Sequence, residues 1–370
     1  MKRAAAAAVA ALAAFALSGC GAQMTPTSAE SSGTPSQPSA SATVTPLDQL
    51  DVLADPATYQ GPSTATLHID GISAPASGPS QELPVTVTSH DRSGDQQITV
   101  TDASRVVAVD IAGSIADTIW ALGLSDSVVG RDVAASYPGS EDVPVVTGNG
   151  HSINAEAVLA LKPTLVITDG SVGPTTAIDQ LRDVGVTVVY VDNVSSFDGA
   201  AQLARDVADV LGAPDAGEAL ARALGQSVDQ VRAQVAAIAP AKPLRMVFLY
   251  LRGSASVYYV FGAESGADQL IAGLGGVDAA GEAGIKGSQP LTDEAMLATE
   301  PDVILVMTDG LESVGGVDGL VADFPAIALT NAGKNRRVVD MADTQILSFG
   351  PRSAAVLDGL ARAIYAPEAK

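Results

Sequence analysis

Residues 153–163 read INAEAVLALKP, and residues 291–301 read LTDEAMLATEP. The second residue of each stretch, Asn154 or Thr292, is suited to capping a helix, a glutamate (Glu156 or Glu294) lies in the first helical turn, and a proline closes each stretch. The helix dipole favours a negative charge at that place. An apolar strand that ends in Thr-Asp-Gly follows each proline. We interpret the pair as an internal repeat, which predicts two lobes built on the same local unit.

Apolar strands and helical segments alternate on both sides of the repeat. Residues 105–109 form a continuous apolar run, which indicates a strand buried on both faces. Such alternation is typical of an α/β domain with a mostly parallel sheet. Further strands are expected at residues 143–147, 165–167, 186–191, 245–251, 303–307 and 337–341, and helices at residues 113–124, 154–161, 177–184, 197–211, 267–274, 292–298 and 351–366.

A single long helix is expected to join the two lobes. Residues 215–238 lie between Pro214 and Pro240 and contain neither a proline nor a strand pattern. At 1.5 Å per residue, a helix of this extent is about 36 Å long. Two alternating segments, 83–88 and 96–101, predict a β-hairpin with a seven-residue loop ahead of the first lobe. The fold class is therefore α/β, with two Rossmann-like lobes bridged by a single long helix and a ligand cleft between the lobes.

The N-terminal residues are typical of a secretory signal. Lys2 and Arg3 precede an apolar run, residues 4–17, that is too short to span a bilayer. Residues 21–43 are mostly Ser, Thr, Pro, Ala and Gly, which cannot bury a core. Residues 44–80 are ambiguous, because a strand could form at Thr66-Leu67-His68-Ile69 but prolines break anything longer. The expected parts are a signal peptide (1–19), a lipid-anchored flexible tether (20–80), an N-terminal lobe with its leading hairpin (81–213), a bridging helix (214–240) and a C-terminal lobe (241–370).

Composition and charge exclude several functions. The 370 residues carry a formal net charge of −22, so neither nucleic acid nor an anionic lipid surface is expected as a partner. A Gly-x-Ser-x-Gly motif and a Walker loop are both absent, which argues against an enzyme. A bare zinc or manganese site is poorly supported, because such sites need several histidines and only His151 lies within the lobes.

Leu17-Ser18-Gly19-Cys20 resembles the lipobox of bacterial lipoproteins. That resemblance implies cleavage before Cys20, the only cysteine of the chain, and lipidation of its thiol. With Cys20 lipidated no disulfide can form. The mature protein is then expected on the extracellular face of the cell membrane, held there only through its lipid anchor.

Residues 154–167, NAEAVLALKPTLVI, are similar to the most recognisable stretch of the class III, or cluster A, solute-binding proteins of ABC importers. The resemblance covers residues 83–370. Within that superfamily the chain is most similar to HmuT-type haem-binding lipoproteins of actinobacteria, through GNGHSIN at 148–154, YLRG at 250–253 and FGPR at 349–352. The resemblance implies a monomeric receptor, not an enzyme, that captures haem and delivers it to an ABC permease dimer with its ATPase. A ferric siderophore or a corrinoid stays open as the alternative ligand.

Two side chains are candidates for the haem iron. His151 lies in a glycine-flanked turn, where a histidine is most often simply solvated, and Tyr250 lies in a strand, where a tyrosine is usually core. Arg252 projects from the same strand face as Tyr250, and an arginine beside a phenol favours the phenolate, a donor suited to ferric iron. The resemblance implies that His151 and Tyr250 are the axial ligands of haem b, one from each lobe, with Arg252 supporting the tyrosine.

Other site residues are weaker candidates. Met307 is expected to face the cleft as an apolar wall or to belong to the core, and Tyr258 or Tyr259 to stack on the porphyrin. Arg352 is expected to meet a propionate or to pair with a surface carboxylate. Glu156 and Glu294 fit helix capping. The resemblance implies instead that they dock onto arginines of the two permease subunits, where such charges set register and encounter rate.

Overall fold

The structure, a computed structural model, describes residues 44–69, 71–148 and 151–368, and residues 44–370 belong to one structural unit. The expected signal peptide, the lipidated Cys20 and the tether up to residue 43 lie outside the described residues. Among the helices that are described, none has the length and apolarity needed to cross a membrane.

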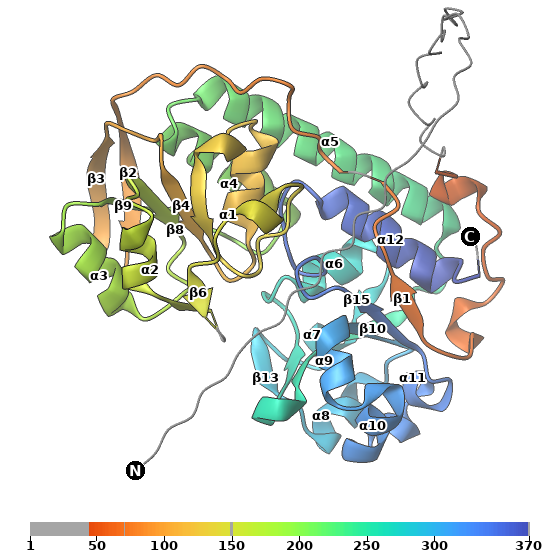
Figure 1. The fold of residues 1–370 in the computed structure, drawn as a ribbon. Helices are drawn as coiled ribbons and strands as arrows, with labels where there is room; N and C mark the ends of the chain where they lie inside the picture. The colour runs from red at the N-terminus through yellow and green to blue at the C-terminus, as the bar shows by residue number, and fades with distance from the viewer. Residues whose placement is uncertain (1–43, 70, 149–150, 369–370) are drawn as a thin grey trace, which may run out of the picture. The chain divides into compact units, whose positions relative to one another are not determined.

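The N-terminal lobe is a four-stranded parallel sheet with helices on both faces (Figure 1). Neighbouring strand residues face opposite cores, because side chains alternate along a strand. Thus Val106 packs with the helices of one face, and Val107 packs with the helices of the other. In sheet order the strands are β5 (Val128–Arg131), β4 (Val106–Val109), β8 (Leu165–Thr168) and β9 (Thr187–Tyr190), covered by α1 (Ser114–Ala121) and α4 (Phe197–Val210) on one face and by α2 (Ala155–Ala160) and α3 (Thr175–Asp183) on the other.

The leading hairpin is present, but its loop is shorter than the expected seven residues. Strands β2 (Val85–Asp91) and β3 (Gly94–Val100) pair as far as Asp91 and Gly94. The polar residues read as a loop continue the strands at an exposed edge, where His90 Nδ1 lies 3.0 Å from Asp95 Oδ1. Polarity alone does not indicate a loop, because polar side chains also fit the solvated face of a strand, and Ser89 of this stretch is buried and accepts from the amide of Tyr190.

The bridging helix is α5 (Pro214–Ile238), a single helix of 25 residues that begins with proline in its first turn. Its N-terminal half packs in the core of the first lobe through Leu220 and Leu224, and its C-terminal half packs in the core of the second lobe through Val231 and Val235. The expectation of one long helix between two lobes is confirmed.

The C-terminal lobe is built on a seven-stranded mixed sheet. The strands follow the order β1 (Ser63–Ala65), β15 (Val338–Met341), β14 (Val303–Met307), β10 (Arg245–Arg252), β11 (Val257–Phe261) and β13 (Ser288–Pro290), with β12 (Val277–Asp278) also paired to β10. Strand β11 runs antiparallel to β10 and was not expected from the sequence. Helices α5, α6 (Ala267–Gly273) and α12 (Ser353–Tyr365) cover one face, and α7 (Ala279–Glu282), α8 (Asp293–Thr299), α9 (Thr308–Ser313), α10 (Gly316–Asp323) and α11 (Asn331–Lys334) lie towards the other.

Residues 44–80 differ from the expected tether, because they pack against both lobes. Strand β1 adds to the sheet edge in parallel with β15, three residues before the segment expected as a strand, and Leu47 is fully buried. Further on, the backbone N–H of Ile72 donates to the carbonyl of Pro351, and that of Glu82 to the carbonyl of Gly212. The segment thus has contacts on the C-terminal lobe and, further along, on the N-terminal lobe (Figure 1). The composition of this segment does not indicate this packing. A few apolar residues are enough to order a strand when the rest of the chain provides the sheet edge to which it pairs.

Candidate functional site

A cavity of about 430 Å³ lies between the two lobes. It opens at the carboxyl ends of the parallel strands, where α/β proteins commonly bind ligands. The N-terminal lobe contributes Ile111, Ala112, Val133, Ala134, His151 and Ser195, and the C-terminal lobe contributes Tyr250, Arg252, Phe261, Ser265, Met307, Asp309, Asp343, Thr344, Leu347 and Ser348. Ile111 and Val133 are about half exposed (53% and 48%), so the first wall presents apolar surface that a ligand could cover.

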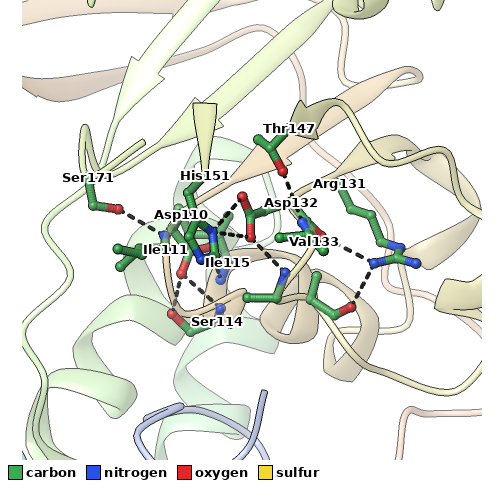
Figure 2. Close-up of polar contacts among 12 residues, drawn as sticks. Asp110, Ile111, Ser114, Ile115, Arg131, Asp132, Val133, Thr147, His151 and Ser171 are labelled. Carbon is green, nitrogen blue, oxygen red and sulfur yellow. Dashed lines mark hydrogen bonds and ion pairs between the residues drawn. The ribbon is translucent and has the colours of Figure 1, made fainter. Parts of the chain in front are cut away.

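His151 stands on the first wall in the turn of a short hairpin. Strands β6 (Thr147–Gly148) and β7 (Ser152–Ile153) flank the turn, and His151 has a left-handed φ of 56°. Its Nδ1 lies 3.0 Å from Oδ1 of Asp132, whose side chain is fully buried (Figure 2). A carboxylate only accepts, so Nδ1 carries the proton and Nε2 keeps its lone pair when the ring is neutral. The hydrogen bond that His151 Nδ1 donates to Asp132 raises the pKa of His151 against the opposing effect of burial.

The floor of this wall is acidic. Asp110, directly after β4, accepts hydrogen bonds from the backbone amides of Ser114 and Ile115 and so caps α1 (Figure 2). Complete burial, with the nearby Asp169 charge as the next cause, raises the pKa of Asp110 to about 7.

Tyr250 stands on the opposite wall, in the long strand β10. Its ring is stacked on the ring of Phe261, with centroids 5.9 Å apart and planes 11° from parallel. The guanidinium carbon of Arg252 lies 4.4 Å from the Tyr250 ring centroid, and both side chains line the cavity as their spacing predicted. Phe261 was missed because β11 carried no strand expectation.

Arg252 is fixed by an aspartate that the sequence did not point to. Its Nη2 lies 2.8 Å from Oδ2 of Asp343, and its Nη1 donates to the carbonyl of Leu251. Within the described residues no hydrogen bond joins the guanidinium to the Tyr250 hydroxyl, so Arg252 acts on the phenol by its charge over the ring. Burial, its largest cause, raises the pKa of Asp343, whereas the Arg252 charge lowers it.

Of the other residues expected in the haem pocket, Met307 lines the cavity and the two tyrosines do not. Met307 lines the cavity, with its sulfur 3.5 Å from Arg252 Nη2. Tyr258 does not: it lies edge-on to Phe324, with ring centroids 5.0 Å apart, in the core of the opposite sheet face. Tyr259 pairs with Tyr250 across the strands but is not among the lining residues. The expectation that one of these two tyrosines stacks on a bound ring is therefore not supported by the geometry.

Arg352 is not among the residues that line the cavity, and the expectation that it pairs with a surface carboxylate was wrong. Arg352 forms an ion pair with Asp117 of α1, and the two side chains are only 11% and 3% exposed. The partner is thus a buried carboxylate of the other lobe, neither a ligand group nor a surface residue. Burial raises the pKa of Asp117, and the Arg352 charge works against that rise. A contact between positions so distant in the chain leaves no local sequence signal.

Glu156 and Glu294 occupy matching places in the first turns of α2 and α8, and both are exposed. The capping is done by their neighbours: Asn154 Oδ1 accepts from the amide of Ala157, and Thr292 Oγ1 from the amide of Ala295, both at 3.1 Å. Among the described contacts neither glutamate carboxylate accepts a hydrogen bond. Capping alone therefore does not explain them. The described residues also contain no cluster of three His, Cys, Asp or Glu side chains that could hold a bare metal ion.

A lobe-bridging helix, two repeat-related lobes and a cleft at the strand ends define a class of proteins that bind ligands between lobes. The family model of the periplasmic binding proteins matches residues 107–344, and the chain belongs to this family. Within the family it is similar to the haem-binding protein HmuT, whose crystal structure superposes with a TM-score of 0.78 at 41% identity, covering 84% of this chain and 99% of that one. The HmuT resemblance expected from the sequence is thereby confirmed.

More distant curated relatives include a substrate-binding protein and a ligand-binding protein. The ABC transporter substrate-binding lipoprotein YvrC of Bacillus subtilis (strain 168) is 27% identical over 76% of this chain and 86% of its own length. The cobalamin-binding protein of Halobacterium salinarum (strain ATCC 29341 / DSM 671 / R1) is 28% identical over 80% of this chain and 81% of its own length. The protein is therefore a substrate-binding protein and not an enzyme, as expected.

Proposed function

We propose that this protein captures haem between its lobes and delivers it to an ABC importer for uptake of haem iron. The observation that carries the proposal is one histidine and one tyrosine on opposite walls of an apolar cavity between the lobes. Haem leaves two axial positions of its iron open, one on each side of a flat ring. His151 Nε2 and the Tyr250 phenolate oxygen are donors suited to those two positions.

The rest of the cavity suits a flat, largely apolar ring. Ile111 and Val133 offer exposed apolar surface on one side, and the partly buried Phe261 and Met307 line the other. Arg252 is the supporting residue, because its guanidinium packs over the Tyr250 ring and helps to hold the side chain in the cavity wall. HmuT, similar over most of the chain, is a haem-binding protein, and its solved variants replace an arginine, a histidine or a tyrosine by alanine.

Delivery to an importer completes the proposal. Lipidated Cys20 anchors the protein to the outer face of the membrane, and the exposed Glu156 and Glu294, one on each lobe, dock onto the two subunits of a permease dimer that works with its ATPase. Exposed charges at equivalent places suit a partner made of two similar subunits. A monomeric receptor presents one such pair.

The test is an absorption titration of the chain without its signal peptide. Hemin is expected to give a saturating Soret band at one equivalent, altered in different ways by Tyr250→Phe and His151→Ala. Tyr258→Phe and His90→Ala are the matched controls, because both residues lie away from the cavity, and they keep the parent spectrum. Cyanocobalamin and a ferric siderophore are titrated in parallel, since a corrinoid or siderophore is the alternative ligand and a cobalamin-binding protein is among the relatives. Saturation by either of these, with no hemin shift, would overturn haem as the ligand.

A further inference from the structure

The described residues next to His151 form little regular structure. The flanking strands, β6 and β7, have two residues each, and glycines stand at 148 and 150. His151 itself adopts a φ of 56°, a conformation that few residues other than glycine take. A side chain on such a turn has no neighbour along its own strand to fix the ring. Its orientation must come from another element.

Asp132 supplies that orientation from the edge of the sheet. It directly follows β5, and its backbone N–H donates to the carbonyl of Ala108 at 3.3 Å. Its Oδ1 accepts from the amide of Ala134 at 2.7 Å and from His151 Nδ1 at 3.0 Å, while Oδ2 lies 3.2 Å from the same nitrogen (Figure 2). The carboxylate is thus fixed before it meets the imidazole, so it fixes the imidazole in turn.

Apart from His151 when its ring is protonated, no cation lies within hydrogen-bond reach of the Asp132 carboxylate in the described part of the chain. The guanidinium of neighbouring Arg131 donates to backbone carbonyls, those of Asp132, Ala135 and Ser140, and not to the carboxylate. A fully buried carboxylate hydrogen-bonded to a neutral ring is costly unless positive charge is placed nearby. Iron bound at Nε2 would place it on the far side of the same ring.

We propose that Asp132 is a positioning residue that turns His151 into an iron donor, an inference that rests on the proposed haem function. It keeps the proton on Nδ1, so that Nε2 faces the cavity with a free lone pair. Its negative charge, relayed through the imidazole, stabilises ferric over ferrous iron. The site is thereby selective for the oxidised form of the ligand.

Two variants separate orientation from charge. Asp132→Asn keeps an oxygen that can accept from Nδ1 but removes the charge, so His151 stays bound, the reduction potential of the bound haem becomes more positive, and the hemin Kd rises about tenfold. Asp132→Ala removes both, so its hemin spectrum matches that of His151→Ala. Asp117→Asn is the matched control, because it removes another buried carboxylate of the same lobe, whose partner is Arg352. It lowers the melting temperature but leaves the spectrum and the potential as in the parent.

A second readout keeps this inference separate from the haem proposal. Multiple-bond ¹⁵N NMR of the ligand-free protein at alkaline pH reports the tautomer of each neutral histidine, and His151→Ala identifies the relevant signals. We expect the Nδ1–H tautomer in the parent and a shift towards Nε2–H in Asp132→Ala. If the parent failed to bind hemin, the haem proposal would be wrong. The NMR result would still show whether Asp132 fixes the tautomer of His151. The inference would be overturned if the His151 tautomer were unchanged in Asp132→Ala. It would also be overturned if the hemin spectrum and the reduction potential of Asp132→Ala equalled those of the parent.

Discussion

The two lobes share one repeat, yet they hold their candidate ligands in different ways. In the C-terminal lobe Tyr250 lies on an eight-residue strand within a seven-stranded sheet, stacked on Phe261 and covered by Arg252. In the N-terminal lobe His151 lies on a turn and depends on one buried carboxylate of Asp132. A strand orients a side chain by itself, whereas a turn needs a partner from elsewhere in the fold. The repeat thus accounts for the common scaffold of the two lobes, whereas the residues that orient the candidate ligand differ between the two cavity walls.

The largest effect is expected where the lobes join. Arg352→Ala leaves the Asp117 carboxylate buried without its partner, and breaking a buried pair in this way costs about 3 kcal/mol of unfolding free energy. Urea unfolding followed by circular dichroism and by Trp120 fluorescence measures it. Arg222→Ala, which breaks an exposed pair with Glu218, is the control and destabilises the protein far less, because exposed ion pairs contribute little to stability. Equal losses in the two variants would show that the lobes are not tied by the buried pair.

Sequence reasoning reached most of the fold, because buried parallel strands such as Val106–Val109 are apolar throughout and a proline-bounded helix such as α5 has an unmistakable length. It failed where a segment's structure depends on distant parts of the chain. Strand β1 is ordered by pairing with β15, near the other end of the chain. At the site, residue type alone favoured a solvated His151 and a core Tyr250, and the resemblance to HmuT-type proteins made both of them candidate ligands. Their supporting aspartates, Asp132 and Asp343, come from other strand ends, and such convergence exists only in three dimensions.

The next effect separates the two walls directly. Tyr250→Phe removes an anionic donor and is expected to weaken hemin binding about 100-fold, roughly 2.7 kcal/mol. His151→Ala removes a neutral donor and is expected to cost about tenfold, roughly 1.4 kcal/mol. Hemin Kd values from the Soret titration measure both, with Tyr258→Phe as the matched control. If both variants retained hemin as well as the parent does, the assignment of two ligands would fail.

A smaller effect is expected behind the tyrosine. Asp343 Oδ2 faces Arg252 while its Oδ1 accepts from the amide of Asp309, so an asparagine cannot satisfy both donors. Asp343→Asn therefore loosens Arg252 over the Tyr250 ring. This pair is partly exposed, so the loss in hemin affinity is up to about fivefold, about 1 kcal/mol. Because Tyr250 is also fixed by its strand, Asp343→Asn should change the spectrum less than Asp132→Ala does. The reverse order would contradict the contrast between strand and turn.

The smallest effect on the isolated protein is expected at the one place where the lobes are alike. Glu156→Ala and Glu294→Ala each remove an exposed carboxylate that accepts no hydrogen bond among the described contacts, so unfolding free energies change by less than about 0.5 kcal/mol and hemin Kd stays the same. Haem uptake by cells that carry the importer should nevertheless fall in each variant, and by a similar factor. The exposed Asp293→Ala, in the same turn as Glu294, is the control and leaves uptake unchanged. Loss of uptake in only one glutamate variant would mean that the partner meets the two lobes unequally. Equal loss of uptake in both variants would mean that the repeated helix starts serve to bind two similar partner subunits. The two walls of the cavity, which bind the ligand, do not need to be alike.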